Sequence, residues 1–490
     1  MLQRIRESCA LLLIVLLPFH ALLVTVLTKF VAGPGHAPLT GLALWKEGLL
    51  GLILAVALCE ILPRTCQRLA TCLSGRQARD SRLTKAFDSI DLLILALIVL
   101  AVFLGVSQFS ILNSQFLFGF KYDLLPLIAF LVLRRVEWSS RFARVAGYWL
   151  LVTGCLIAVY GLVTLVLPES FFRFLGYSDL HSTYVSSGPI AAFQQIGGEG
   201  IRRIQSTFSG PNQMGLWMLI PWTMVLAAPL RGRGPHPGTG AAWWFMFFIF
   251  SIAILLTFSR TAWIGAAVIV VMTVLRSPLS VWERVRVRSI ALIACISLIA
   301  LLALLSPSIL LRSGSTIDHF RRPIEAMKVI ALNPFGLGLG SAGPAQNRVA
   351  DACLDFPAGS DISWAKDRTD LCIFVDHVQR QPDISVRACR CPLLPENWYL
   401  QIGIELGIVG LVVYVILVVL ILRRLHQSDR GHGKWDNVLS RVPYHMAHRV
   451  FLALSVAALF LHAFEDSAVS WTLWVLVAVI LPIVWSRKAA

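Results

Sequence analysis

The chain has 490 residues, of which 57% are hydrophobic and only 14% are charged, and its formal net charge is +16. Soluble globular proteins carry about 25% charged residues. This composition therefore excludes a soluble enzyme, a disordered chain and a fibrous protein. A basic excess in a soluble chain would indicate nucleic-acid binding, whereas in a membrane protein it is typical of basic cytoplasmic loops.

Apolar segments long enough to cross a bilayer recur along the whole chain. A hydrocarbon core of about 30 Å needs about 20 apolar residues per helix. A segment at 111–133 is interrupted by Lys121, Tyr122 and Asp123. Eleven uninterrupted segments meet the requirement: 9–28, 40–62, 88–108, 145–167, 213–230, 242–258, 261–275, 289–310, 398–422, 449–467 and 470–486.

The distribution of Lys and Arg favours counting the interrupted segment as a twelfth span. With twelve spans that alternate from an N-terminus on the inner side, most of the 43 Lys and Arg residues fall in inner loops. Removing one span would move the later basic loops to the outer side, against the positive-inside rule. We therefore predict an all-α polytopic membrane protein of about twelve transmembrane helices, with both termini cytoplasmic and with no nucleic-acid partner.

This topology divides the chain into three parts. Residues 1–310 form helices one to nine and include an outer loop at 168–212. Residues 311–396 form a large outer loop between helices nine and ten, and residues 397–490 form helices ten to twelve. Loops longer than about 15 residues usually carry function or are disordered. We therefore expect the functional residues in the two long outer loops and at the helix ends beside them.

Four of the ten cysteines fall in the large outer loop, namely Cys353, Cys372, Cys389 and Cys391. An oxidising outer compartment would form two disulfides from them, with three connectivities open. A direct bond between Cys389 and Cys391 would be strained, so we expect each of them to pair with Cys353 or Cys372. Zinc ligation is the alternative, although the spacing lacks the usual paired C-x₂-C.

Arginines on the outer side form three clusters beside small and hydroxyl residues. The clusters are Arg202 with Arg203, Arg260 alone, and Arg312 with Arg321 and Arg322. Guanidinium groups bind phosphate through paired hydrogen bonds and stay charged when partly desolvated. The start of the sixth span, just after Asn212, would add free backbone N–H groups. The clusters predict an anion site at the outer boundary; the alternative is that these arginines extend to lipid headgroups.

The tenth span begins with polar residues. Glu396 lies at its outer end, where the helix dipole favours a carboxylate, and a simple role beside the helix cap is the alternative. Glu405 lies about 13 Å deeper by helical rise, where a carboxylate must be paired or functional. Gly403, Gly407 and Gly410 are expected to give this helix a smooth face for close packing.

Four elements in the second half of the chain, at 203–212, 256–265, 333–340 and 397–410, follow one another in a specific order. Together they resemble the O-antigen ligase and polymerase superfamily of polytopic membrane glycosyltransferases, and the resemblance covers residues 200–486. The fourth element fits Asn, nine residues and Gly-x-x-Gly, which follows a histidine in the family's ligases. Glu396 stands in the place of that histidine, which favours a polymerase or another transferase over a ligase.

The resemblance implies transfer of a glycan from undecaprenyl pyrophosphate to a saccharide, lipid or protein acceptor. The reaction would take place at the periplasmic face of the bacterial inner membrane, with no nucleotide sugar, metal or other cofactor. Glu396 would act as the base, and His319 is a second candidate. The leaving pyrophosphate would be stabilised by the arginines named above. Further substrate contacts are expected from Asn212, Asn397, Tyr399 and Gln401.

A transporter of an anionic lipid or a lipid-linked glycan is the second hypothesis. Transporters carry polar residues or broken helices near the midplane, often in related halves. Here the polar residues concentrate at the outer boundary and no internal repeat is visible. A purely structural membrane subunit would explain neither the outer arginines nor Glu405. No motif specifies an oligomeric state.

Overall fold

The computed structural model describes residues 1–73, 87–107, 113–178, 188–196, 201–227, 240–275, 313–356, 358–363, 371–376, 378–380, 389–431 and 438–482. These residues are mostly helical, with a few short strands. The expected ninth span at 289–310 and the candidate residue Arg312 lie outside the described residues.

Apolar helices dominate the fold and indicate a membrane protein, while the number of spans stays a prediction. Five helical segments are long and apolar enough to cross a membrane: Leu2–Ala32, Ser89–Ser107, Ser114–Leu133, Ser140–Val163 and Trp398–Ser428. Four shorter apolar helices accompany them: Ala241–Leu256, Arg260–Leu275, Met446–Ala457 and Ser467–Ile480. The segment that Lys121–Asp123 interrupts in the sequence is therefore helical and long enough to span.

The first half of the chain contributes α1 (Leu2–Leu16), η1 (Leu17–Phe19), α2 (His20–Ala32), α3 (Thr40–Ala43), α4 (Trp45–Leu73), α5 (Ser89–Ser107), α6 (Ser114–Gly119), η3 (Phe120–Leu124), α7 (Leu125–Leu133), α8 (Ser140–Val163), α9 (Glu169–Leu175), β1 (Gln194–Ile196), β2 (Ile201–Arg203) and α10 (Pro211–Ala227). The second half contributes α11 (Gly240–Leu256), α12 (Arg260–Leu275), α15 (Ser313–Leu332), α16 (Gly343–Asn347), β3 (Ala352–Phe356), β4 (Leu371–Val375), β5 (Val378–Gln379), α17 (Trp398–Gly431), α18 (Val438–Ala457) and α19 (Ser467–Ile480).

Helix α10 lies at the centre of the bundle. It contacts α8, α11, α12, α18 and α19. Its residues Met214 and 216–220 are almost completely buried, and Trp217 is among the largest fully buried side chains. A helix that is apolar all round is either enclosed by protein or faces lipid, and the burial of these residues shows that α10 is enclosed by its neighbours.

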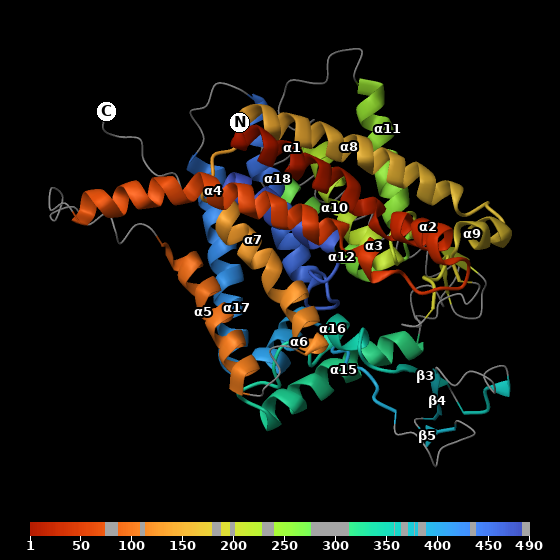
Figure 1. Cartoon of the computed structure of the whole chain (residues 1–490). Helices are drawn as coiled ribbons and strands as arrows, with labels where there is room; N and C mark the ends of the chain where they lie inside the picture. The colour runs from red at the N-terminus through yellow and green to blue at the C-terminus, as the bar shows by residue number, and fades with distance from the viewer. Residues whose placement is uncertain are drawn as a thin grey trace.

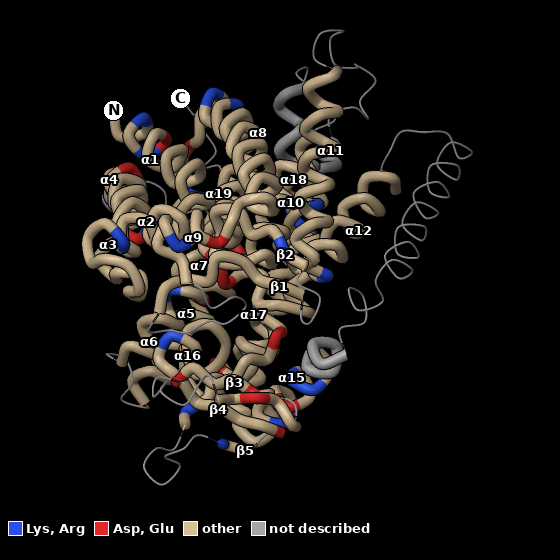
Figure 2. Tube along the Cα trace, turned by 90° about the vertical axis from the view of Figure 1, so that its right-hand side faces the viewer, with Lys and Arg blue, Asp and Glu red and all other residues tan. Residues whose placement is uncertain are grey.

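Basic residues from separate segments meet at the end of the molecule where α1 begins. Arg6 pairs with Glu60 (3.0 Å), Arg134 with Asp88 (2.8 Å) and Asp91 (3.0 Å), and Arg135 with Asp91 (2.7 Å). We call these six residues the N-end cluster. Figures 1 and 2 show α15 and β3–β5 at the opposite end of the molecule. The separation agrees with the basic loops facing one side; which side of a membrane they face stays a prediction.

The described part of the large loop contains the helices α15 and α16 and a small disulfide-bonded sheet. Strand β4 pairs in parallel with β3 and antiparallel with β5. Figure 1 shows this sheet beside the helical bundle, beyond the end of α15. Two disulfides join Cys353 to Cys391 and Cys372 to Cys389. Cys389 and Cys391 therefore each pair with one of the earlier cysteines, as expected, and no thiolate of the four is left to ligate zinc.

Helix α17 is broken at Gly407, which has a φ of +71°, so one of the three glycines expected to form a smooth packing face instead lies at a kink. Three hydrogen bonds cross the break, from Leu337 N to Ile404 O (2.8 Å), from Gly338 N to Glu405 O (3.0 Å) and from Ile408 N to Pro334 O (2.9 Å). A Cβ atom at Gly407 would lie 2.3 Å from Pro334 O, so only glycine fits. The two glycine motifs, at 333–340 and 397–410, thus meet and satisfy each other's backbone groups.

Candidate functional site

Glu396 immediately precedes α17 but does not cap it. Asn397 is the capping residue, because its Oδ1 accepts a hydrogen bond from Leu400 N (3.0 Å) while its Nδ2 donates to Leu459 O (2.9 Å). Glu396 itself has a φ of +49°, a left-handed conformation that costs a non-glycine residue about 1–3 kcal/mol. Such backbone strain clusters at functional sites.

The Glu396 carboxylate lies between two side chains of α15. His319 Nδ1 lies 2.5 Å from Glu396 Oε2 in an ion-pair contact, and Arg322 donates a hydrogen bond to Glu396 Oε1. Residues 319 and 322 are three apart and therefore lie on one face of the helix. The side chains of His319 and Arg322 are 31% and 36% exposed. Glu396 is therefore held by His319 and Arg322, and both of these side chains remain partly exposed.

Two further polar side chains interact electrostatically with this carboxylate. His462, in the connection between α18 and α19, interacts electrostatically with Glu396 and Arg322. Arg260, the first residue of α12, has an attractive charge interaction with Glu396. We call His319, Arg322, Glu396, His462 and Arg260 the Glu396 cluster. Four separate segments of the chain contribute to it.

The electrostatics of the cluster leave it positively charged. Burial alone would raise the pKa of Glu396, but the hydrogen bond from His319 and the charge of Arg322 outweigh it and hold the pKa below its ordinary value. Burial lowers the pKa of His462 to about 4, against the attraction of Glu396. At neutral pH the cluster therefore contains one carboxylate, two guanidinium groups and a neutral imidazole at His462, which suits an anionic ligand.

Arg203 and Asn212 form the framework beside this cluster. The Arg203 guanidinium donates to Thr257 O (2.9 Å), Gln194 Oε1 (3.1 Å) and Asn212 Oδ1 (2.9 Å), and Arg203 is buried. These bonds tie β2 to the start of α10 and to the turn just before α12. Arg203 thereby fixes the turn that presents Arg260, and most of its own donors are used within the protein.

Arg202 and Arg321, also expected at the anion site, make other contacts. Arg202 donates to Leu167 O (2.6 Å) and lies 4.2 Å from the centre of the Phe193 ring. Successive strand residues point to opposite faces, so Arg202 and Arg203 diverge. Arg321 pairs with Glu325 on its own helix (2.7 Å), with half of its side chain exposed. Among the candidate arginines that the structure describes, Arg322 thus contacts Glu396 and Arg260 has a charge interaction with it.

Tyr399 and Gln401 lie inside the protein rather than in an open site. Tyr399 OH donates to Ser455 O (2.9 Å), and Gln401 Nε2 donates to Asp123 Oδ1 (3.1 Å). Asp123 also hydrogen-bonds to Glu405, and both carboxyl groups are buried. A hydrogen bond between two carboxyl groups requires a proton on one of them. Glu405 is therefore paired, as its depth requires, through a partner that the sequence did not reveal.

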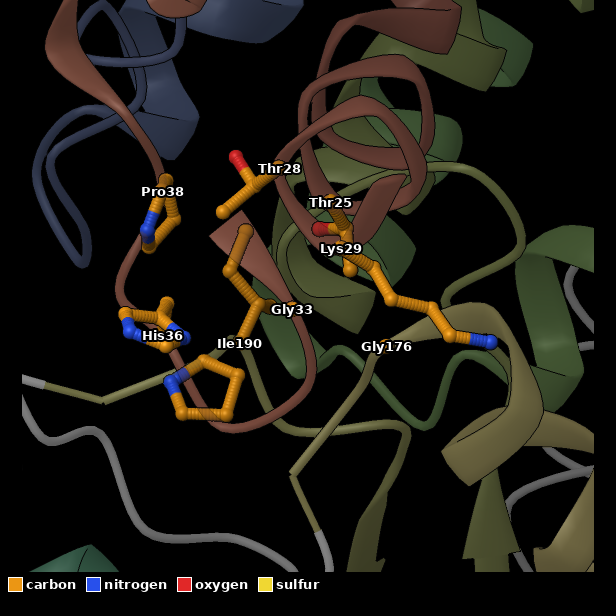
Figure 3. A pocket seen from close by; sticks show the side chains of 9 residues that line it. Thr25, Thr28, Lys29, Gly33, His36, Pro38, Gly176 and Ile190 are labelled. Carbon is orange, nitrogen blue, oxygen red and sulfur yellow. The ribbon is translucent and has the colours of Figure 1, made fainter. Parts of the chain in front are cut away.

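A shallow hollow lies between α2 and the segments near Gly176 and Ile190, away from the Glu396 cluster (Figure 3). Thr25, Thr28 and His36 contribute to its lining. The Lys29 ammonium is turned away from His36, as Figure 3 shows, and contacts the Phe174 ring at 4.2 Å. The Lys29 ammonium is therefore not placed to bind an anionic ligand in this hollow.

Nothing in the sequence indicated that Asp123 is a partner of Glu405, and for His462 the sequence left two interpretations open, pairing with the outer arginines or simple solvation. His462 belongs to the polar group His462, Glu465 and Asp466 at the end of the expected eleventh span, and that group was the available signal. In the structure α18 ends at Ala457, so His462 lies in an interhelical connection. Among the described residues no three His, Cys, Asp or Glu side chains are grouped to hold a metal ion.

Comparison with protein-family models and with curated proteins found no match to this chain. Function must therefore be argued from the chemistry of the site itself.

Proposed function

We propose that the protein is a membrane glycosyltransferase that moves a glycan from an undecaprenyl-pyrophosphate donor to a saccharide, lipid or protein acceptor. The observation that carries the proposal is the Glu396 carboxylate held between His319 and Arg322, with Arg260 close by. A carboxylate–imidazole pair accepts a proton, and guanidinium groups bind a leaving diphosphate. The sequence resemblance to O-antigen ligases and polymerases points to the same chemistry.

The reaction is a single displacement at the anomeric carbon of the donor glycan. The acceptor hydroxyl oxygen forms the new C–O bond while the C–O bond to the diphosphate breaks. The hydroxyl proton passes to the Glu396–His319 pair, and the bonding electrons leave with the prenyl diphosphate. Arg322 and Arg260 stabilise the charge that develops on the diphosphate oxygen. The anomeric configuration is inverted.

In this proposal His319 and Glu396 act together as the base. Because Nδ1 of His319 contacts Glu396, its Nε2 is directed away from the carboxylate and is the atom that meets the acceptor hydroxyl. The carboxylate orients the imidazole and stabilises the imidazolium that forms, as in other carboxylate–histidine pairs. Glu396 is thereby essential even when His319 carries the proton.

The location of the cluster supports a reaction at the periplasmic face of the bacterial inner membrane. Helix α15 and the disulfide-bonded sheet lie at the end opposite the N-end cluster (Figure 1). Disulfides persist in oxidising compartments, and basic loops stay in the cytoplasm. Both rules favour the same orientation of the chain in the membrane.

A transporter of an anionic lipid is the second candidate, and one observation favours it. Helix α17 is broken at Gly407, beside the buried Asp123–Glu405 pair, and broken helices with buried polar groups are typical of transport sites. The break, however, is filled by residues 334–338 of the same chain through three backbone hydrogen bonds. We therefore rank transport second.

Reconstitution of the full chain in proteoliposomes with an undecaprenyl-pyrophosphate oligosaccharide separates the two candidates. A transferase forms a new glycosidic bond and releases one undecaprenyl pyrophosphate for each glycan moved. A transporter carries the labelled lipid across the bilayer with the phosphate–sugar bond intact. Movement without bond change would refute the proposal. Lys328→Ala is the control, because Lys328 is exposed on the same helix as His319 and Arg322.

A further inference from the structure

His462 is a buried histidine whose Nε2 is itself buried and has no hydrogen-bond partner among the described residues. The residue as a whole is 9% exposed. The charged groups that act on it are Glu396 and Arg322. A buried polar atom left unsatisfied costs about 1–3 kcal/mol, so one that persists beside a binding cluster calls for a functional explanation.

The connection that carries His462 is fixed to the start of α17, directly after Glu396. Trp398 N donates to Ala458 O (2.9 Å), and Asn397 Nδ2 donates to Leu459 O (2.9 Å). The Phe464 and Trp398 rings make an edge contact at 5.8 Å. The histidine and the carboxylate are thus presented from one rigid unit, which holds the imidazole at a set position beside the site.

We infer that His462 is a diphosphate-binding residue, which donates a hydrogen bond from Nε2 to an oxygen of the lipid-linked diphosphate. This inference rests on the function proposed above and adds a ligand to that site. Arg322 and Arg260 provide the charge, while His462 provides a neutral, directional donor beside Glu396 and Arg322.

The balance of donors and acceptors favours a diphosphate over a sugar at this position. Arg322, Arg260 and His462 are all hydrogen-bond donors, whereas Glu396 is the acceptor of the cluster and both of its oxygens already contact Arg322 and His319. A diphosphate offers only acceptor oxygens in this setting, whereas each sugar hydroxyl also brings a donor. Burial keeps the pKa of His462 at about 4, so the imidazole has one N–H to donate at neutral pH.

The test is equilibrium binding of undecaprenyl diphosphate without a glycan, so that no turnover takes place, to the full chain in lipid nanodiscs. His462→Phe retains the ring shape but has no donor, whereas His462→Gln places an amide N–H near the position of Nε2. We expect His462→Phe to weaken binding by roughly 10- to 100-fold and His462→Gln to bind within about threefold of wild type. Lys328→Ala is the exposed control.

Two results would overturn the inference. The first is wild-type affinity in His462→Phe. The second is an equal loss of affinity in His462→Phe and His462→Gln at unchanged thermal midpoints, which would indicate a packing role. If His462→Phe does not fold, the smaller His462→Asn must lose affinity while His462→Gln retains it. Competition by undecaprenyl monophosphate and by inorganic pyrophosphate distinguishes the lipid-linked from the soluble diphosphate, and we expect the lipid diphosphate to bind most tightly.

Failure of this inference is distinguishable from failure of the proposed function. If wild type transfers glycan and His462→Phe binds the diphosphate normally, only the role of His462 is wrong. If wild type neither binds undecaprenyl diphosphate nor transfers a glycan, the proposed function is wrong.

Discussion

The two ends of the molecule use arginine in different ways. In the N-end cluster Arg134 is 4% exposed and contacts both Asp88 and Asp91, while Arg6 is fully buried against Glu60. In the Glu396 cluster Arg322 shares a single carboxylate with His319 and remains 36% exposed. The first arrangement encloses its charges, and the second leaves them accessible.

The balance of positive and negative charges also differs between the N-end cluster and the Glu396 cluster. The N-end cluster contains three arginines and three carboxylates, whereas the Glu396 cluster, as defined from the described residues, contains two arginines and one carboxylate. Buried opposite charges need each other, since an unpaired buried charge is very costly. An accessible positive excess instead gains most from an anionic ligand. The comparison teaches that burial and charge balance separate structural arginines from binding arginines in this chain.

The largest effect on stability is expected at the N-end cluster. Arg134→Ala leaves Asp91, which is fully buried, with one arginine partner fewer and should lower the free energy of unfolding by about 3–5 kcal/mol. Denaturant titration in mixed micelles measures this. Arg141→Ala, at an exposed position, is the control. If Arg134→Ala were as stable as Arg141→Ala, the arginines of the N-end cluster could not be distinguished as structural.

The largest effect on activity is expected at the Glu396 cluster. Arg322→Ala should reduce glycan transfer by about 100- to 1,000-fold, because one donor to the developing charge is lost. Its thermal midpoint should stay close to that of wild type, since the side chain is partly exposed. Initial rates in proteoliposomes provide the measurement. A loss of activity that merely follows a loss of folded protein would contradict a binding role.

Between the two ends, the break in α17 should tolerate only glycine. Gly407→Ala forces a φ of +71° on a residue with a Cβ and should cost about 1–3 kcal/mol of stability. Gly51→Ala in α4 is the matched control, because a Cβ there meets nothing within 4 Å. That control should be neutral or stabilising by up to about 1 kcal/mol. Similar behaviour of both variants would show that the break does not depend on glycine.

The Glu396 ion pair predicts a defined pH dependence. The pKa of Glu396 lies below its ordinary value of 4.5, so its contribution to stability is present above that pH and is lost as the pH falls through the folded-state pKa. The difference in thermal midpoint between wild type and Glu396→Gln should therefore be constant above pH 5 and shrink below 4.5. A difference that already disappears near pH 6 would contradict the assignment.

The smallest effect is expected for the neighbour of Arg322. Arg321→Ala removes an exposed pair with Glu325, which is worth less than about 1 kcal/mol of stability. Initial rates of glycan transfer by the two single variants, measured side by side, test whether adjacent arginines on one helix differ as the structure requires, because only Arg322→Ala is expected to lose activity. A large destabilisation by Arg321→Ala would mean that its partners are more important than its exposure indicates.

Local composition was enough to predict the apolar helices. The expectation that Cys389 and Cys391 each pair with an earlier cysteine is confirmed, but which of them pairs with Cys353 and which with Cys372 was left open by the sequence. The glycines of α17 were interpreted less well. Their spacing resembled a packing face, but Gly407 is a break that becomes visible only when Pro334 is placed against it.

The assignment of individual polar residues depended on partners far away in the sequence. Arg203 and Arg260 look alike as outer arginines, yet Arg203 is occupied by Thr257 O and Asn212. Glu405 was recognised as a buried carboxyl group, but its partner Asp123 is contributed by η3, earlier in the chain. Such pairings are decided by tertiary packing, which no local pattern contains.

Single-turnover transfer by Glu396→Gln tests the central claim most directly. Labelled undecaprenyl-pyrophosphate glycan is bound to wild type and variant in proteoliposomes, acceptor is added, and both the new glycosidic bond and free undecaprenyl pyrophosphate are followed. The account predicts donor binding within a few-fold of wild type and a transfer rate reduced by about 100-fold or more. Wild-type transfer by Glu396→Gln, or release of an intact donor on the far side of the bilayer, would contradict it.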